Sequence, residues 1–213
     1  MSKKMSLLNL VFYGIGRASA ERRRHYIRLV ENLEEDFEVN IIEILNDIGK
    51  ICNPRSNEFS SDLNSLPLFS NSTHIVRDFR KDIIVSKFLK LVSKFDDCHQ
   101  DNFISTYSLL QQLSMMLAST QHYEAGLVLA IRDDLAFDEK RLTAVIRQMR
   151  DTILLDNSVF ATSVFHSNRG ICERLYFGSC ESASVALSRI NLVPSYLDEV
   201  GNLAYLHMIL LRS

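Results

Sequence analysis

The chain has 213 residues, of which 46% are hydrophobic and 23% are charged, and its formal net charge is -2. This composition is typical of a globular protein and excludes a disordered or fibrous chain. The length fits one domain, and the nearly balanced charge argues against a nucleic-acid-binding protein, which would carry a strongly basic face.

The N-terminal segment has the pattern of a buried strand. "LLNLVFY", residues 7–13, is a short apolar run that suits an interior strand of a mostly parallel sheet. Two preceding lysines and a following "ASA" also resemble the pattern of a signal peptide. Asn9 and Arg17 interrupt that pattern, so we favour the strand. A helix over residues 18–36 and a strand over 37–45 would complete a βαβ unit.

The next elements alternate between strands and helices. Residues 46–71 are rich in Ser and Asn and contain two prolines, which predicts a long surface loop. The later pattern predicts helices at 80–95 and 102–120, a strand at 125–131, a helix at 139–151, a strand at 158–166, an extended segment at 173–179, and helices at 181–190 and 194–213. We therefore expect an α/β fold with a mostly parallel central sheet flanked by helices.

The cysteines and the hydropathy pattern bear on the compartment. Cys52, Cys98, Cys172 and Cys180 form neither a C-x-x-C pair nor a zinc-type spacing with histidine, so we expect no disulfide framework and no zinc site. A reducing, cytosolic compartment is the simpler interpretation. No stretch approaches the roughly 20 apolar residues that a membrane-spanning helix needs.

The end of the first predicted strand, "YGIGR", is a candidate nucleotide site, because ligands of open α/β sheets bind beyond the carboxyl ends of the strands. Tyr13 could stack on a base, and Arg17 could contact phosphate. Gly14, Ile15 and Gly16 would let the backbone approach the nucleotide closely. The full G-x-G-x-x-G motif is absent, and a tight turn is the alternative explanation for the two glycines.

The strand at 125–131 ends in a second polar motif, Arg132, Asp133 and Asp134. Magnesium commonly binds one or two carboxylates together with substrate phosphates, and manganese accepts the same oxygen ligands. A metal ion at this position could neutralise charge on a departing nucleoside diphosphate, which glycosyl transfer from a nucleotide sugar requires. Solvated charges in a loop are the alternative.

Several segments resemble a known family, including "NFISTYSLLQQLSMMLAST", which is similar to the helix before its motif strand. "YEAGLVLAIRDDLAF" resembles the segment of bacterial and viral polysaccharide glycosyltransferases in which a strand runs into Arg, a variable residue, Asp, Leu and an aromatic residue. "GICERLYFGSCESASVAL" is similar to the family's Gly, acidic, Arg, aromatic, Gly, Ser stretch, and "PSYLDEVGNLAYLHMIL" to its acidic closing helix. The resemblance implies a single GT-A domain over residues 1–213, with a Rossmann-like nucleotide-binding part at about 1–138 and an acceptor part at about 139–213.

The resemblance also implies an activity, namely the metal-dependent transfer of a sugar from a UDP-sugar donor to a glycan hydroxyl, with Mn²⁺ or Mg²⁺ as cofactor. Asp134 is the surer metal ligand, and Asp133 is a weaker ligand and a candidate base. Glu173 is the first candidate for the catalytic base, with an ion pair to Arg174 as the alternative. His207 could be a late metal ligand or a structural histidine.

Further expectations concern the donor and the rival functions. Asp78 follows a short apolar piece and could contact uracil or ribose, and Arg132 belongs to the donor motif. The sugar of the UDP donor could be glucose, galactose or a deoxyhexose such as rhamnose. For a viral chain the compartment would be the host cytosol, and further domains of a larger polypeptide stay open. The rivals are a catalytically silent nucleotide-binding or interaction domain and a nucleotidyltransferase.

Overall fold

The computed structural model describes most of a central sheet and the helices that cover it. The described residues are 5–14, 20–46, 51–53, 58–60, 67–77, 126–133, 135–163 and 171–187. Within them, six strands form one sheet in the order β5-β2-β1-β6-β8-β7. These strands are β1 (Ser6–Gly14), β2 (Phe37–Asn46), β5 (Thr73–Arg77), β6 (Leu127–Arg132), β7 (Val159–Ser163) and β8 (Ile171–Ser179).

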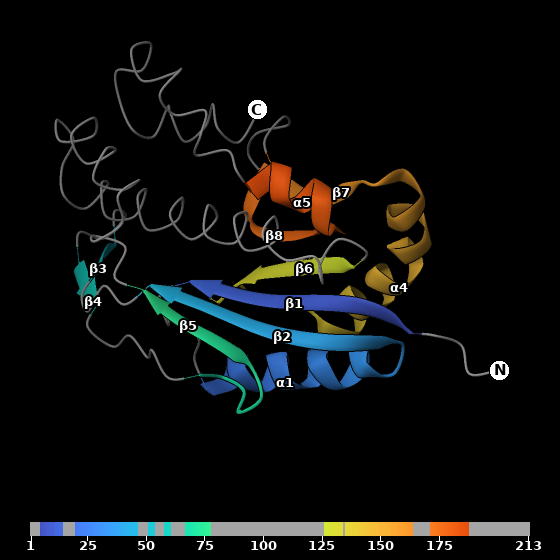
Figure 1. Cartoon of the computed structure of the whole chain (residues 1–213). Coiled ribbons are helices and arrows are strands. Elements are labelled where there is room, and N and C mark those ends of the chain that lie inside the picture. The colour runs from blue at the N-terminus through green and yellow to red at the C-terminus, as the bar shows by residue number, and fades with distance from the viewer. Residues whose placement is uncertain are drawn as a thin grey trace, which may run out of the picture.

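The sheet is parallel on one side and antiparallel on the other (Figure 1). β1 runs parallel to both β2 and β6, and β2 runs parallel to β5. β8 runs antiparallel to β6 and to β7. The predicted α/β fold with a mostly parallel sheet is therefore confirmed, and strands from both predicted parts of the chain join the same sheet.

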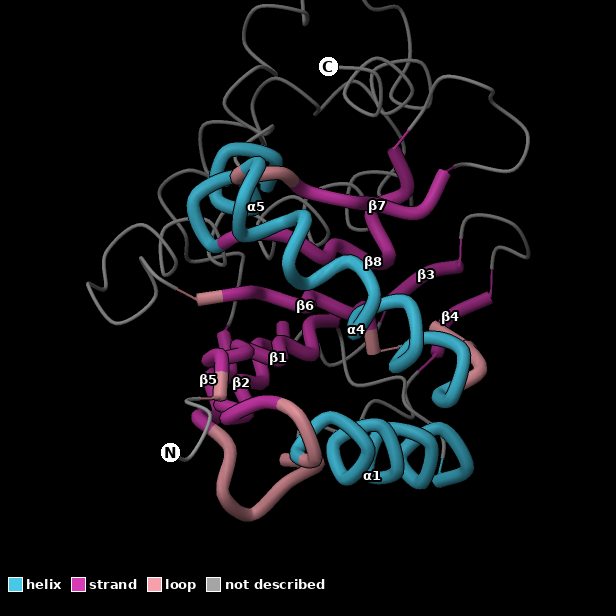
Figure 2. Tube along the Cα trace, turned by 90° about the vertical axis from the view of Figure 1, so that its right-hand side faces the viewer, coloured by secondary structure: helices cyan, strands magenta, loops and turns pink. Residues whose placement is uncertain are grey.

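Helices cover both faces of this sheet. The described helices are α1 (Ala20–Glu34), α4 (Glu139–Asp156) and α5 (Cys180–Leu187). α1 lies on one face and α5 on the other (Figures 1 and 2). Among the described residues, no helix is both long enough and apolar enough to cross a membrane.

Several predicted elements are confirmed and some need correction. The first βαβ unit, the strand at 125–131 and the helix starting at 139 are all present. The predicted loop at 46–71 contains two short strands, β3 (Ile51–Asn53) and β4 (Glu58–Ser60), which pair antiparallel. The predicted extended segment at 173–179 is the longer strand β8. The helices predicted at 80–95, 102–120 and 194–213 lie outside the described residues.

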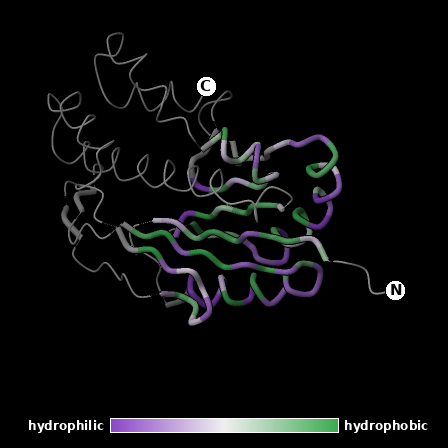
Figure 3. The backbone as a smooth tube through the Cα atoms, viewed as in Figure 1, coloured by the Kyte–Doolittle hydropathy of each residue, from purple (hydrophilic) through white to green (hydrophobic). Residues whose placement is uncertain are grey.

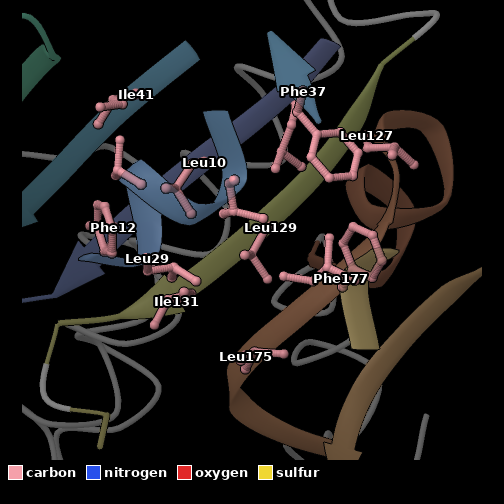
Figure 4. Packing of buried hydrophobic residues seen from close by; sticks show 14 of the residues in the cluster. Leu10, Phe12, Leu29, Phe37, Ile41, Leu127, Leu129, Ile131, Leu175 and Phe177 are labelled. Carbon is pink, nitrogen blue, oxygen red and sulfur yellow. The ribbon is translucent and has the colours of Figure 1, made fainter. Parts of the chain in front are cut away.

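The alternation of side chains along the strands builds the core between the sheet and the two helices α1 and α4. Every second residue of β1, namely Leu8, Leu10 and Phe12, packs in one cluster with residues of α1 such as Leu29 and of α4 such as Ile146. Figure 4 shows Leu10, Phe12 and Leu29 in this cluster, and Figure 3 shows that the strands are largely apolar and that the helices around them are of mixed hydropathy. Removing this apolar surface from water is the main favourable contribution to folding.

Glu43, in the middle of β2, is fully buried and anchors the segment before β5. Its carboxylate accepts hydrogen bonds from the backbone N–H groups of Leu68, at 2.7 Å, and Phe69, at 3.1 Å. The hydroxyl of Ser72 donates a third hydrogen bond to it. A buried carboxylate needs such partners because it has lost its hydration. The end of the predicted loop is therefore fixed to the sheet.

Candidate functional site

The carboxyl ends of β1 and β6 lie side by side at the point where the strand order reverses. From β1 the chain proceeds to β2 on one side and later returns to β6 on the other side. The two strands stay paired to their ends, where Tyr13 is opposite Arg132. Ligands of open α/β sheets bind in the crevice beyond such a reversal. The sequence motifs "YGIGR" and "RDD" both begin at this edge.

Gly14 and Asp133 are close neighbours where β1 and β6 end. A Cβ atom built on Gly14 would lie 2.0 Å from Oδ1 and 2.7 Å from Oδ2 of Asp133. The side chain of Asp133 is thus placed in the space that a larger residue at position 14 would fill, and Asp133 is only 2% exposed. The alternative of a solvated loop charge is therefore wrong for Asp133.

The same contact changes the explanation for the glycine. Gly14 is the last residue of β1, and its φ lies outside the left-handed region that favours glycine. A left-handed backbone conformation is therefore not the reason for a glycine at position 14. The glycine is needed because a carboxylate approaches it closely. That carboxylate belongs to Asp133 of the same chain, so an approaching nucleotide is not required to explain it.

Tyr26 of α1 fixes the backbone of the segment that follows β6. Its hydroxyl lies 2.9 Å from the carbonyl oxygen of Asp133, to which it donates, and 3.4 Å and 3.3 Å from those of Arg132 and Leu135. The N–H of Asp133 donates to the carbonyl of Tyr13 at 2.8 Å. The backbone of Asp133 is held on both sides, so its carboxylate has a defined position.

Tyr13 and Arg132 differ in exposure. Tyr13 is fully buried, so its ring offers no exposed face on which a base could stack. Arg132 is the last residue of β6 and is half-buried. Both residues contribute to the shape of the strand ends, but only Arg132 is accessible to a ligand from solvent.

The register of β8 places the backbone of Glu173 near this edge. The pairing of β6 with β8 ends at Ile131 and Leu175. If the same antiparallel register continued, Asp133, two residues after Ile131, would lie opposite Glu173, two residues before Leu175. Glu173 belongs to β8, while its side chain lies outside the described residues. Of the two catalytic residues expected from the sequence, Asp133 therefore directly follows β6, and Glu173 belongs to the neighbouring strand β8.

The remaining predicted site residues cannot be placed. They lie outside the described residues and are Ile15, Gly16, Arg17, Asp78, Asp134 and His207. Within the described ranges, no group of three or more His, Cys, Asp or Glu side chains is arranged to hold a metal ion.

Sequence reasoning missed the role of Tyr26, although it predicted the helix to which this residue belongs. Its ring does pack in the core, 4.7 Å from the ring of Phe12 between centroids. A buried tyrosine hydroxyl usually has a hydrogen-bond partner. That rule predicts that Tyr26 has a partner, but the partner depends on how α1 packs and cannot be read from the sequence.

Comparison of the chain with models of known protein families finds no match, and comparison with curated proteins finds none either. The function therefore has to be inferred from the residues and from the geometry of this edge of the sheet.

Proposed function

We propose that the chain is a metal-dependent glycosyltransferase of the GT-A type, which moves a sugar from a UDP-sugar donor to a hydroxyl of a glycan acceptor. The observation that carries the proposal is the buried carboxylate of Asp133 against Gly14, at the reversal of the strand order. A carboxylate held at this position suits a site that handles a diphosphate and its metal ion.

The two aspartates that follow β6 in the sequence have the ligand chemistry that a divalent cation requires. Mg²⁺ and Mn²⁺ in nucleotide sites commonly use one or two carboxylates and take their other ligands from phosphate and water. Asp134 would be the main protein ligand, and Asp133, which precedes it directly in the sequence, would support it. When bound, the metal ion would neutralise the charge that develops on the departing UDP.

The other residues of this edge would orient the substrates. Tyr26 and the β1–β6 pairing hold the backbone at Asp133, which limits how far the acidic motif can move. Such preorganisation lowers the cost of aligning reacting groups. Glu173 would remove the proton from the acceptor hydroxyl, since the register of β8 brings its backbone to the same edge. We place this reaction in the cytosol, in keeping with the cysteine usage.

The test compares the wild type with two aspartate variants of equal charge change. Asp134→Asn removes the main metal ligand, and Asp138→Asn is its control. Asp138 caps α4 by accepting a hydrogen bond from the N–H of Arg141 at 3.0 Å, and asparagine caps helices about equally well. UDP with Mn²⁺ should raise the melting temperature of the wild type and of Asp138→Asn, because a ligand that binds only the folded state stabilises it. Asp134→Asn should lose this response together with the hydrolysis of UDP-sugars.

The outcomes separate the proposal from its rivals. If the Asp134→Asn variant turns over UDP-sugars at the wild-type rate at saturating Mn²⁺, the assignment of Asp134 as a metal ligand is wrong. Stabilisation by UDP and Mn²⁺ without hydrolysis or transfer from UDP-glucose, UDP-galactose or UDP-rhamnose would favour a silent binding domain. A clear preference for UTP over these donors would favour a nucleotidyltransferase.

A further inference from the structure

A pocket of about 260 Å³ lies between the first turns of α1 and the segment that follows β6. The described residues that line it are Glu21, Arg22, His25, Leu135, Ala136 and Phe137. Those from α1 are polar, and those after β6 are apolar. Ligand pockets combine an apolar wall with a few well-placed polar groups in this way.

His25 has a fixed orientation at the edge of this pocket. Its Nδ1 lies 2.9 Å from Oε2 of Glu139, and Nε of Arg28 lies 2.7 Å from Oε1 of the same carboxylate. These contacts hold the pKa of Glu139 at about 2, with the hydrogen bond from His25 as the largest cause. Glu139 is therefore a charged acceptor at neutral pH.

The charge of Glu139 decides the tautomer of His25. An ionised carboxylate can only accept hydrogen bonds, so we assign the proton to Nδ1. Nη2 of Arg28 also lies 3.0 Å from Nδ1, but a protonated Nδ1 cannot accept from it. In the neutral ring, Nε2 is then a hydrogen-bond acceptor, and it bonds to none of the described residues.

Phe137 gives the opposite side of the pocket an aromatic character. Its ring stacks on Tyr26 with a centroid distance of 5.6 Å and an interplanar angle of 23°. Phe137 is only partly buried and packs on the edge of the core. The C–H groups on one face of a pyranose ring pack well on such an aromatic surface, while its hydroxyls need donors and acceptors around the rim.

The charges around the pocket decide which class of ligand fits. An anion such as phosphate would be attracted by Arg22 but would also meet Glu21 in the lining and Glu139 behind His25. The lining therefore gives an anion little net attraction. A neutral ligand rich in hydroxyl groups can use both the donors and the acceptors.

We propose that this pocket binds the ring of a neutral sugar, with a hydroxyl donating to Nε2 of His25 and with Phe137 covering the apolar face of the ring. The inference rests on the proposed function and adds to it the place of the acceptor. Leu135 lines the pocket, and its carbonyl lies 3.3 Å from the Tyr26 hydroxyl that also holds Asp133. A sugar bound here lies beside the candidate donor site.

The test measures the binding of simple sugars to the full chain without nucleotide or metal ion. The probes are the methyl glycosides of glucose, galactose and rhamnose, with inorganic phosphate as the anionic alternative, and saturation-transfer NMR reports binding. The variants are His25→Ala and Phe137→Leu. The control is Glu35→Gln, which removes the contact of Glu35, directly after α1, with Arg147 of α4 (2.7 Å) but leaves the pocket lining unchanged.

At least one glycoside should bind the wild type and Glu35→Gln equally, and its affinity should fall about tenfold in each pocket variant, as expected for the loss of one good contact. The proposal is overturned if no glycoside binds the wild type, if both pocket variants bind like the wild type, or if phosphate binds in place of the sugars. Sugar binding without a response to UDP and Mn²⁺ would contradict the donor site alone. A response to UDP and Mn²⁺ without binding of any glycoside would contradict the sugar pocket alone.

Discussion

Gly14 and Asp133 are so close that a Cβ atom at position 14 would lie 2.2 Å from Cγ of the aspartate. Gly14 ends β1 and Asp133 directly follows β6, and the hydrogen bonding between these parallel strands continues to the N–H of Asp133. The glycine and the buried carboxylate therefore form one structural unit. A change at either position should affect the other.

The first prediction concerns this unit. Gly14→Ala should lower the free energy of unfolding by about 1–3 kcal/mol, because an added methyl group in a well-packed site forces its neighbours to move. Asp133→Ala removes the obstacle, so the double variant should be more stable than the sum of the single effects predicts, with a coupling of about 0.5–3 kcal/mol. Urea denaturation of the four proteins measures both quantities.

Gly126 offers a control for the same substitution. It is also buried, but its added Cβ would meet Nδ2 of Asn9 at 3.2 Å, and Asp133 is not among its nearest neighbours. Gly126→Ala should therefore combine additively with Asp133→Ala. Additive effects for Gly14→Ala as well would show that the contact with Asp133 is not what requires a glycine.

The second prediction concerns the hydroxyl of Tyr26. Tyr26→Phe keeps the ring in the core but leaves the buried carbonyl of Asp133 without this donor. The expected cost is about 1–3 kcal/mol in the free energy of unfolding. If Tyr26 also positions the acidic motif, the stabilisation by UDP and Mn²⁺ should decrease in the same variant. An unchanged unfolding midpoint would contradict the hydrogen bond.

The third prediction follows from the low pKa of Glu139. Its folded pKa of about 2 lies below the ordinary value of 4.5, so it binds fewer protons in the folded chain than in the unfolded chain. The resulting stabilisation is present above pH 4.5 and is lost as the pH falls toward 2. The difference in melting temperature between the wild type and Glu139→Gln should therefore shrink across that window.

The magnitude of this effect should be modest. Arg28 is about half exposed, at 48% of its side chain, so solvent and salt screen its contact with Glu139. At neutral pH we expect Glu139→Gln to cost about 0.2–1 kcal/mol, as for other exposed pairs. A gap in melting temperature that stays constant as the pH falls would show that Glu139 is not held in its charged form by these partners.

The sequence predicted the elements that have a strong local pattern. The apolar runs at 7–13 and 37–45 and the amphipathic stretch between them predicted the first βαβ unit, and the structure contains it. The strands β3 and β4 have three residues each, which is too short for an apolar period to be recognised. They were therefore predicted as loop.

The candidate site was predicted by position, while its contacts were not. The rule that ligands bind at strand ends predicted that "YGIGR" and "RDD" lie at the same edge. The burial of Asp133 and its contact with Gly14 depend on the pairing of β1 with β6, which are far apart in the sequence. The pairing of His25 with Glu139 depends on how α1 packs against α4. Local patterns contain no information about either contact.

The last prediction concerns Cys180, at the start of α5. Burial raises the pKa of its thiol to about 11, while the hydrogen bond from Nδ2 of Asn9, at 3.6 Å from the sulfur, acts in the opposite direction. Only the thiolate reacts with alkylating reagents, so at mildly alkaline pH both the small thiolate fraction and the burial should protect it. Peptide mapping after treatment with iodoacetamide should find Cys180 unmodified in the folded chain and modified after unfolding in urea. Equal labelling of Cys180 in both states would show that this end of α5 opens readily, and it would contradict the packing of Cys180 against Asn9.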